Sequence, residues 1–218
     1  MPSAVLIVAS TRVHADVQEI LRIQDTASAL IEQGRAVDLL VPSTSALLSA
    51  ALDPAVRVFT VPEFPLCGNP PPRASIRRLI TATLMFLRGV ALASRRDYDA
   101  LHGMNDGAIV ARAITGASLR HLPYVAEFHL PFAAPGLRRG IRTTIARAME
   151  RNAFRRAAAV VLPDEATLAC FPARLSRARV SLIPDPHAEI TPSAFTFGEF
   201  NTALVHLYDY ILRSQQEN

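Results

Sequence analysis

Histidines, carboxylates and an arginine stand where the apolar runs of this chain end, and these are the side chains that could do chemistry. His129 closes the run VAEFHL and precedes the loop sequence PFAAPG. An imidazole at such a place can act as a general base or orient a sugar hydroxyl. A structural histidine bonded to nearby backbone explains the same pattern equally well. We therefore predict His129 as the candidate catalytic residue, with that alternative open.

Two further pairs of polar residues are candidate substrate ligands. Arg12 and His14 follow the first apolar run, in STRVHAD, and suit an anionic or hydroxylated substrate, although an exposed loop explains them as well. Asn105 and Asp106 stand where a helical pattern begins, in GMNDGAIVARAI. Helix N-capping accounts for at least one of these two without any function. All four are predicted here as substrate-binding residues.

Several classes of chemistry are excluded by residues that the chain lacks. All 23 basic residues are arginine, so a Schiff-base lysine, a P-loop lysine and a kinase Lys–Glu pair are impossible. The turn after the first run has no glycine, which argues against a dinucleotide cofactor bound there. The sequence has no G-x-S-x-G, no H-E-x-x-H and no paired cysteine spacing. We therefore expect neither a cofactor nor a metal.

Short apolar runs alternate with longer amphipathic segments along the chain, and these elements must position the candidate residues. The predicted strands are 4–10, 36–42, 56–62, 98–104, 123–130, 157–164 and 179–185, and the predicted helices are 17–33, 73–95, 107–117, 139–157 and 198–213. Continuously apolar strands that alternate with helices are typical of parallel sheets covered on both faces. The sequence therefore predicts an α/β fold: a single doubly wound, mostly parallel, Rossmann-like sheet with helices on both faces. In such sheets, ligand sites form at the carboxyl ends of the strands.

Charge is concentrated in the middle of the chain. Residues 73–156 hold 15 arginines against five carboxylates, and the helix predicted at 139–157 is especially rich in arginine. This pattern fits a solvated helix face, or a surface that meets anionic lipid or a phosphorylated ligand. Nucleic acid is an unlikely partner, because no aromatic residues interleave with the arginines. The apolar stretch 79–93 is too short to span a bilayer, and MPSAVLIVAS lacks the features of a signal peptide. We expect a cytoplasmic protein, with peripheral attachment to the inner membrane face as an extension of that expectation.

The order of these segments resembles the amino-terminal half of GT-B glycosyltransferases, in particular the retaining family four, which uses nucleotide-sugar donors. The likeness is carried by EILRIQDTASALIEQGRAVDLLVP, YDALHGMNDGAIVARAI, LPYVAEFHLP and AAAVVLPDEATLACF followed by RVSLIPD. The closing segment FTFGEFNTALVHLYDYILRS resembles the family's final helix, which crosses back onto the first domain. The resemblance implies that His129 lies beside the centre of sugar transfer.

One departure from the family pattern changes the expected function. After IPD the family continues into a donor-binding domain, whereas this chain reads PHAEITPSAF and reaches the final helix at once. We therefore expect an acceptor-type domain at 1–186, a shortened linker at 187–197 and a packing helix at 198–214. The resemblance implies sugar transfer only with a separate donor-domain partner chain, or as a homodimer. A non-catalytic binding or scaffold module, an unrelated Rossmann enzyme that uses His129, and an excised half with its last helix rejoined are the alternatives.

Overall fold

A parallel seven-stranded sheet forms the centre of the molecule. The computed structural model describes residues 3–9, 17–42, 46–61, 76–118, 121–129, 141–171, 179–184, 186 and 196–216. The strand order is β3-β2-β1-β4-β5-β6-β7, and every neighbouring pair is parallel. The strands are β1 (Ala4–Val8), β2 (Ala36–Val41), β3 (Arg57–Thr60), β4 (Ala100–Met104), β5 (Tyr124–Glu127), β6 (Ala159–Leu162) and β7 (Arg179–Leu182). All seven predicted strands are present, and the predicted fold class is confirmed.

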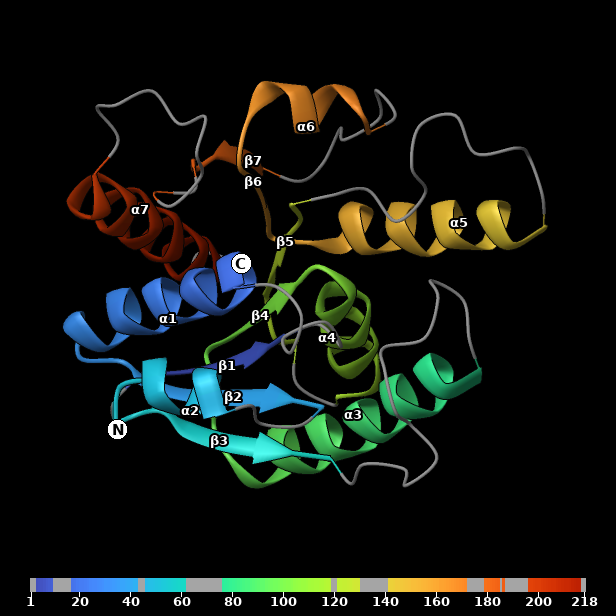
Figure 1. The fold of residues 1–218 in the computed structure, drawn as a ribbon, viewed down its shortest axis with the longest axis horizontal. Helices are drawn as coiled ribbons and strands as arrows, with labels where there is room; N and C mark the ends of the chain where they lie inside the picture. The colour runs from blue at the N-terminus through green and yellow to red at the C-terminus, as the bar shows by residue number, and fades with distance from the viewer. Residues whose placement is uncertain are drawn as a thin grey trace.

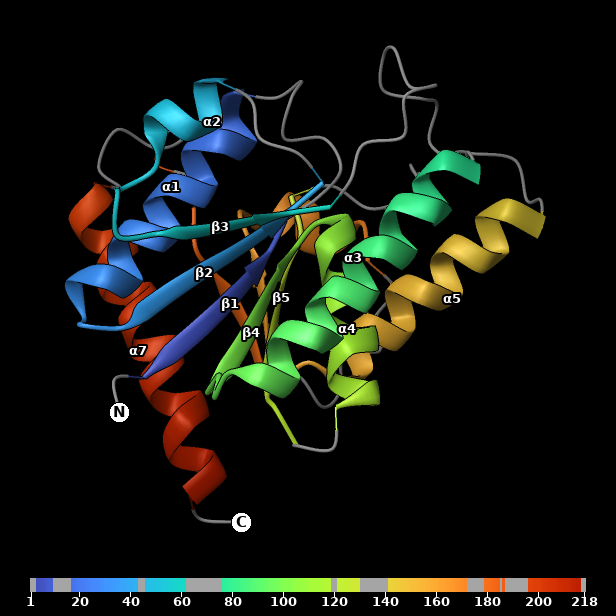
Figure 2. The ribbon, with the colours of Figure 1, turned by 90° about the horizontal axis from the view of Figure 1, so that it is seen from below.

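Helices connect the strands and cover both faces of the sheet (Figures 1 and 2). They are α1 (Val17–Glu32), α2 (Ala46–Ala51), α3 (Ile76–Arg95), α4 (Asp106–Ala117), α5 (Ile141–Arg156), α6 (Glu165–Ala169) and α7 (Phe197–Gln216). The five long helices were predicted, with ends that differ by up to three residues. The short helices α2 and α6 were not predicted, because one turn or two of helix give too little periodicity to detect. Within the described residues, no helix is long and apolar enough to cross a membrane.

Alternate residues of each strand contribute to two separate cores. On one face, Val5 and Ile7 of β1 pack with residues of α1, α2 and α7, and on the other face Leu6 and Val8 pack with α3, α4 and α5. Both faces of each central strand are therefore buried, which explains why these strands are apolar throughout. Figure 2 shows the two helical layers on either side of the sheet.

Local sequence signals set the end of α1 and the start of α7, two helices that pack together on one face of the sheet. Gly34 has φ 73, and backbone hydrogen bonds from Gly34 to Ile31 and from Arg35 to Leu30 end α1 as a Schellman motif. At the start of α7, Thr196 and Glu199 form a capping box: the Thr196 N–H donates to Glu199 Oε2 at 2.7 Å and the Glu199 N–H donates to Thr196 Oγ1 at 3.3 Å. The sequence thus fixes where α1 stops and where α7 begins.

Helix α7 packs against α1 and returns along the same domain (Figure 1). Phe200, Leu204, Tyr208 and Ile211 of α7 are buried in the core on that face. Arg35 Nη2 lies 3.2 Å from Asp209 Oδ1 at the edge of this contact. Helix α7 and helix α1 therefore cover the same face of the sheet together.

Candidate functional site

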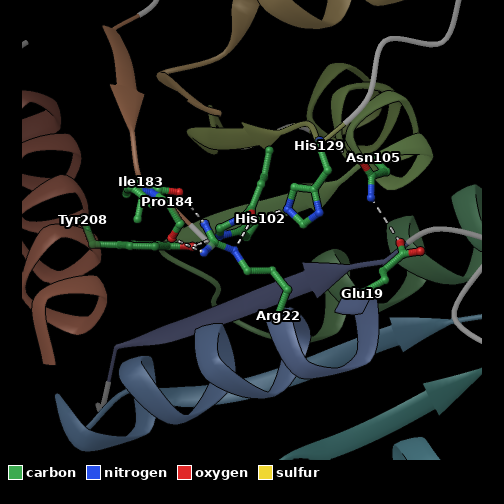
Figure 3. Close-up of polar contacts among 9 residues, drawn as sticks. Glu19, Arg22, His102, Asn105, His129, Ile183, Pro184 and Tyr208 are labelled. Carbon is green, nitrogen blue, oxygen red and sulfur yellow. Dashed lines mark hydrogen bonds and ion pairs between the residues drawn. The ribbon is translucent and has the colours of Figure 1, made fainter. Parts of the chain in front are cut away.

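The candidate site lies at the carboxyl ends of β4 and β5, next to the amino end of α1 (Figure 3). Asn105 directly follows β4, and His129 stands two residues after the end of β5. The end of β4 lies beside the end of β1, where the order in which the chain adds strands to the sheet reverses and where ligands of doubly wound sheets bind. Asn105 and His129 thus lie at the same edge of the sheet, and their predicted roles stay predictions.

Alternation along β5 explains why Glu127 and His129 point the same way. Residues two apart share one face of a strand, so Val125, Glu127 and His129 face the α1 and α7 side while Phe128 enters the opposite core. His129 Nε2 lies 2.8 Å from Glu127 Oε1. The side chain of His129 is 22% exposed, whereas that of Glu127 is 1% exposed. The imidazole therefore joins a buried carboxylate to the surface of the site.

Asn105 holds the backbone of the same site in a strained conformation. Its φ is 50 and its ψ is −121, a region that favours glycine. The Asn105 N–H donates to the Glu127 carbonyl at 2.7 Å, and Asn105 Oδ1 accepts from the His129 N–H at 3.0 Å. Asn105 Nδ2 donates to Glu19 Oε1 at 3.3 Å. These contacts fix the chain entering His129 to the turn that follows β4.

N-capping does not explain the Asn105 side chain. Asn105 takes the N-cap position of α4, yet its side chain makes no capping hydrogen bond and reaches His129 and Glu19 instead. Asp106 is the first residue of α4, where its negative charge favours the helix amino end. The expectation that capping accounts for one of the pair therefore fails for Asn105, because its amide is committed to the site.

Glu127 is the centre of a buried polar network. Its Oε1 accepts from Arg22 Nε at 2.6 Å and from His129, and its Oε2 lies 2.8 Å from His102 Nε2. Burial alone would raise the pKa of Glu127, but the Arg22 guanidinium and the hydrogen bonds from His102 and His129 outweigh burial. They hold the pKa of Glu127 well below its ordinary value. The carboxylate is therefore ionised at neutral pH and acts only as an acceptor.

Arg22 satisfies its charge and its donors within the protein. The side chain is 1% exposed, and its Nη1 and Nη2 donate to the carbonyls of Pro184 and Ile183 at 3.0 and 3.2 Å. Its guanidinium carbon lies 4.2 Å from the ring centroid of Phe200. Arg22 thereby ties α1 to β5, to the residues after β7 and to α7 (Figure 3). Such a fully paired guanidinium serves the architecture of the site and is not placed to contact a ligand.

His102 extends the network to α7. It is fully buried in β4, and its Nδ1 lies 2.8 Å from the Tyr208 hydroxyl. Burial, together with the charge of Glu127, raises the pKa of Tyr208 far above its ordinary value, so the phenol stays protonated. His102 is therefore a buried link between Tyr208 and Glu127.

The arrangement makes His129 a directed proton acceptor. An ionised carboxylate at Nε2 stabilises the ring form with its hydrogen on Nε2, and the neutral ring then carries its lone pair on Nδ1. The same carboxylate orients the imidazole ring, as in other carboxylate–histidine pairs. The site can therefore orient a hydroxyl group or accept its proton.

Two predicted residues lie outside the part of the chain that the structure describes, and two residues of the site were not predicted from the sequence. Arg12 and His14 lie outside the described residues, so their predicted role stays a prediction. Glu127 and Arg22 were not predicted. A glutamate inside the otherwise apolar segment VAEF was a usable signal, because a buried carboxylate needs partners. Arg22 gave no comparable signal, since an arginine among the residues of an amphipathic helix is ordinarily exposed.

A second surface feature is the outward face of α3 and α5, which combines cationic and apolar side chains. Both helices pack against α4, which lies between them, on the far side of the sheet from α7 (Figures 1 and 2). Among their described side chains, the exposed apolar ones include Leu79, Leu87, Ile145 and Met149, and the exposed arginines include Arg88, Arg95, Arg147, Arg151, Arg155 and Arg156. We call this set of residues the α3–α5 face. It carries strong positive charge beside apolar groups.

Known proteins share both the sequence pattern and the fold. A family profile described as Glycosyltransferase Family 4 matches residues 22–186. A sucrose-phosphate synthase from Thermosynechococcus elongatus superimposes with TM-score 0.61 and 16% identity over 84% of this chain and 48% of that chain. MurG from Acinetobacter baumannii gives TM-score 0.53 and 16% identity over 88% of this chain and 48% of that chain.

A shorter sucrose-phosphate synthase chain from the same Thermosynechococcus species matches over 98% of this chain and 98% of its own length, with TM-score 0.61 and 13% identity. No curated protein matches the sequence. At these identities the structures establish the fold. The chain thus spans about half the length of the larger chains that it resembles.

Proposed function

The chain belongs to glycosyltransferase family 4, and we propose that it is the acceptor-binding half of a sugar-transfer enzyme that works with a separate donor-binding domain. The observation that carries this proposal is the pair Glu127–His129, in which a buried carboxylate holds a partly exposed imidazole at the carboxyl edge of the sheet. In this proposal an acceptor hydroxyl donates its hydrogen bond to His129 Nδ1. Asn105 holds the main chain of His129 in place. With Arg12, His14 and Asp106 it completes the proposed acceptor site.

Sugar transfer needs more than this half-site provides. An acceptor must be held in line with the donor, and the diphosphate leaving group must be stabilised by cations or helix ends. The family resemblance assigns most of those groups to the donor domain, which the sequence between β7 and α7 is too short to contain. The proposed division is therefore an acceptor domain at 1–186, a short linker at 187–197 and the packing helix at 198–214. We propose that a separate partner chain supplies the donor-binding groups; in a homodimer, another copy of this chain would supply them.

Binding of nucleotide sugar distinguishes this proposal from a complete enzyme. We expect calorimetric titration with UDP-glucose, GDP-mannose and other nucleotide sugars to give no tight binding to the isolated chain. A pull-down from the source cells should recover a donor-domain chain, and nucleotide sugar should then bind to the pair. Tight donor binding by the isolated chain contradicts the proposal.

A non-catalytic binding or scaffold module is the alternative function. The observation that favours it is that this chain covers only 48% of the larger chains that it resembles. If a sugar acceptor binds the chain but no recovered partner supports turnover, the module is the better account. Loss of acceptor binding in His129→Ala separates specific binding at the site from adhesion elsewhere on the surface.

For location, we propose that the α3–α5 face rests on the anionic inner face of a membrane. Each arginine near such a surface contributes about 1 kcal/mol, and the exposed Leu79, Leu87, Ile145 and Met149 suit the interface between headgroups and acyl chains. Binding should rise with the phosphatidylglycerol content of phosphatidylcholine vesicles and weaken with salt. Replacing Arg147, Arg151 and Arg155 by glutamine should remove it, whereas Arg213→Gln on α7 should not. Vesicle binding that ignores anionic lipid contradicts the proposal.

A further inference from the structure

The buried network around Glu127 reaches from the candidate site to the last helix without interruption. His129 Nε2 contacts Glu127 Oε1, and Glu127 Oε2 contacts His102 Nε2. His102 Nδ1 in turn contacts the Tyr208 hydroxyl, and each of the three distances is 2.8 Å. Only His129 of these four side chains has appreciable exposure. A path of three hydrogen bonds therefore joins a partly exposed imidazole after β5 to a phenol in the core of α7.

The chemistry of the two ends sets the direction of every hydrogen in this path. The phenol of Tyr208 is protonated and buried, and His102 Nδ1 is its recorded partner among the described residues, so its O–H donates to that nitrogen. His102 must then carry its hydrogen on Nε2, from which it donates to the ionised Glu127. The reverse orientation would leave the buried hydroxyl hydrogen without an acceptor.

The orientation of His102 in turn determines how Glu127 meets His129. With Oε2 committed to His102, Oε1 faces both Arg22 and His129. His129 is thereby held as the Nε2–H form with Nδ1 as its acceptor nitrogen. Fixing a functional side chain through a second layer of hydrogen bonds is a general means of holding a site in its working geometry.

Helix α7 touches this network at two points. Tyr208 contacts His102, and the ring of Phe200 lies against the Arg22 guanidinium at 4.2 Å. Both residues lie in the core that α7 and α1 form on this face of the sheet. In Figure 3 the Tyr208 side chain comes from the α7 side and reaches toward His102 and Arg22. The state of the site is therefore linked to the packing of the helix that follows the linker.

We propose that Tyr208 and His102 are positioning residues that fix the tautomer and orientation of His129, so that the site is formed only when α7 is docked. The inference gives the sugar-transfer site proposed above a built-in dependence on α7, and it rests on that proposal for its functional meaning. Neither residue contacts the acceptor. Their effect passes through Glu127.

The test is the hydrogen position on each imidazole, measured by long-range ¹H–¹⁵N spectra at neutral pH and assigned with single histidine variants. In the wild-type chain we expect His102 and His129 both as the Nε2–H form. Tyr208→Phe removes only the hydroxyl, so His102 should populate the Nδ1–H form as well. That form offers Glu127 Oε2 no hydrogen, so the carboxylate can turn and the ring nitrogens of His129 should shift too. Such spectra report hydrogen placement, which a loss of packing alone does not move in a folded protein.

Tyr98→Phe is the matched control. Tyr98 is also buried, and its O–H donates to another buried carboxylate, Asp38 Oδ2, at 2.5 Å. We expect a comparable decrease in melting temperature for the two variants, with His129 unchanged in Tyr98→Phe. A folded Tyr208→Phe variant with wild-type His102 and His129 nitrogens overturns the inference.

If Tyr208→Phe does not fold, the ¹H–¹⁵N spectra of the wild-type chain test the proposal. A hydrogen on Nδ1 of either His102 or His129 would contradict the proposed directions of the three hydrogen bonds. Failure of sugar transfer with every partner would refute the proposed function and leave this spectroscopic result standing. The two proposals therefore fail separately.

Discussion

Breaking the Arg22–Glu127 pair should be among the most damaging changes to the fold. Both side chains are 1% exposed, and Glu127 also receives hydrogen bonds from His102 and His129. Glu127→Gln leaves the guanidinium buried without its counter-charge, and removal of one partner of a buried pair costs about 3–5 kcal/mol. For a chain of this length each kcal/mol lowers the melting temperature by about 2–4 °C, so the expected decrease is about 6–20 °C.

The assay is thermal and urea unfolding at pH 7 of Glu127→Gln, Arg22→Met and the double variant. Because the two residues are in contact, the double variant should be more stable than the sum of the single effects predicts, by about 0.5–3 kcal/mol. Glu165→Gln, an exposed carboxylate in the first turn of α6, is the control and should change stability by less than about 0.5 kcal/mol. Additive single effects, or a Glu127→Gln variant as stable as the control, would refute the reasoning.

Three further predictions follow from the same structure. Because the folded-state pKa of Glu127 is lowered, its contribution to stability is complete above the ordinary carboxyl pKa and is lost as pH falls toward the folded value; urea midpoints of Glu127→Gln should therefore fall less steeply with acid than those of the wild type. Asn105→Ala should be less stable than Asn105→Gly by about 1–2 kcal/mol and should melt at a lower temperature, because glycine adopts φ 50 without strain and alanine does not. Equal melting temperatures would contradict this. Gly107→Ala should lose about 1–3 kcal/mol in urea unfolding, because its Cβ would lie 2.0 Å from the Val8 carbonyl oxygen of β1, and a neutral effect would contradict that contact.

The sequence predicts the fold well because both of its signals are local. Each strand is a short apolar run, and each long helix repeats its apolar residues at helical spacing, so neighbouring residues suffice to identify the element. The end of α1 was predictable for the same reason, because a glycine that follows an amphipathic segment commonly ends a helix with a positive φ, as Gly34 does. The boundaries of α2 and α6 depend on packing over a few residues, which local periodicity does not reveal.

The site was only half predictable, because its centre is made by residues far apart in the chain. His129 and Asn105 stand at strand ends, and the rule for parallel sheets selects such positions. Arg22 and Glu127 are 105 residues apart, and His102 and Tyr208 are 106 residues apart. Nothing in the local pattern of α1 or α7 identifies the partner of a buried glutamate in β5. The pairing of β4 with β5, together with the packing of α1 and α7 on one face of the sheet, brings these four side chains together.

The rate of sugar transfer by this chain combined with its donor-domain partner tests the central claim most directly. The account predicts turnover by the pair and none by either chain alone, with a decrease of about 10²-fold or more in His129→Ala, because proton transfer by a positioned side chain contributes about 10²–10⁴-fold. His121→Ala, an exposed histidine before β5, should leave the rate unchanged. Full activity of the His129→Ala pair, or turnover by the isolated chain, would contradict the account.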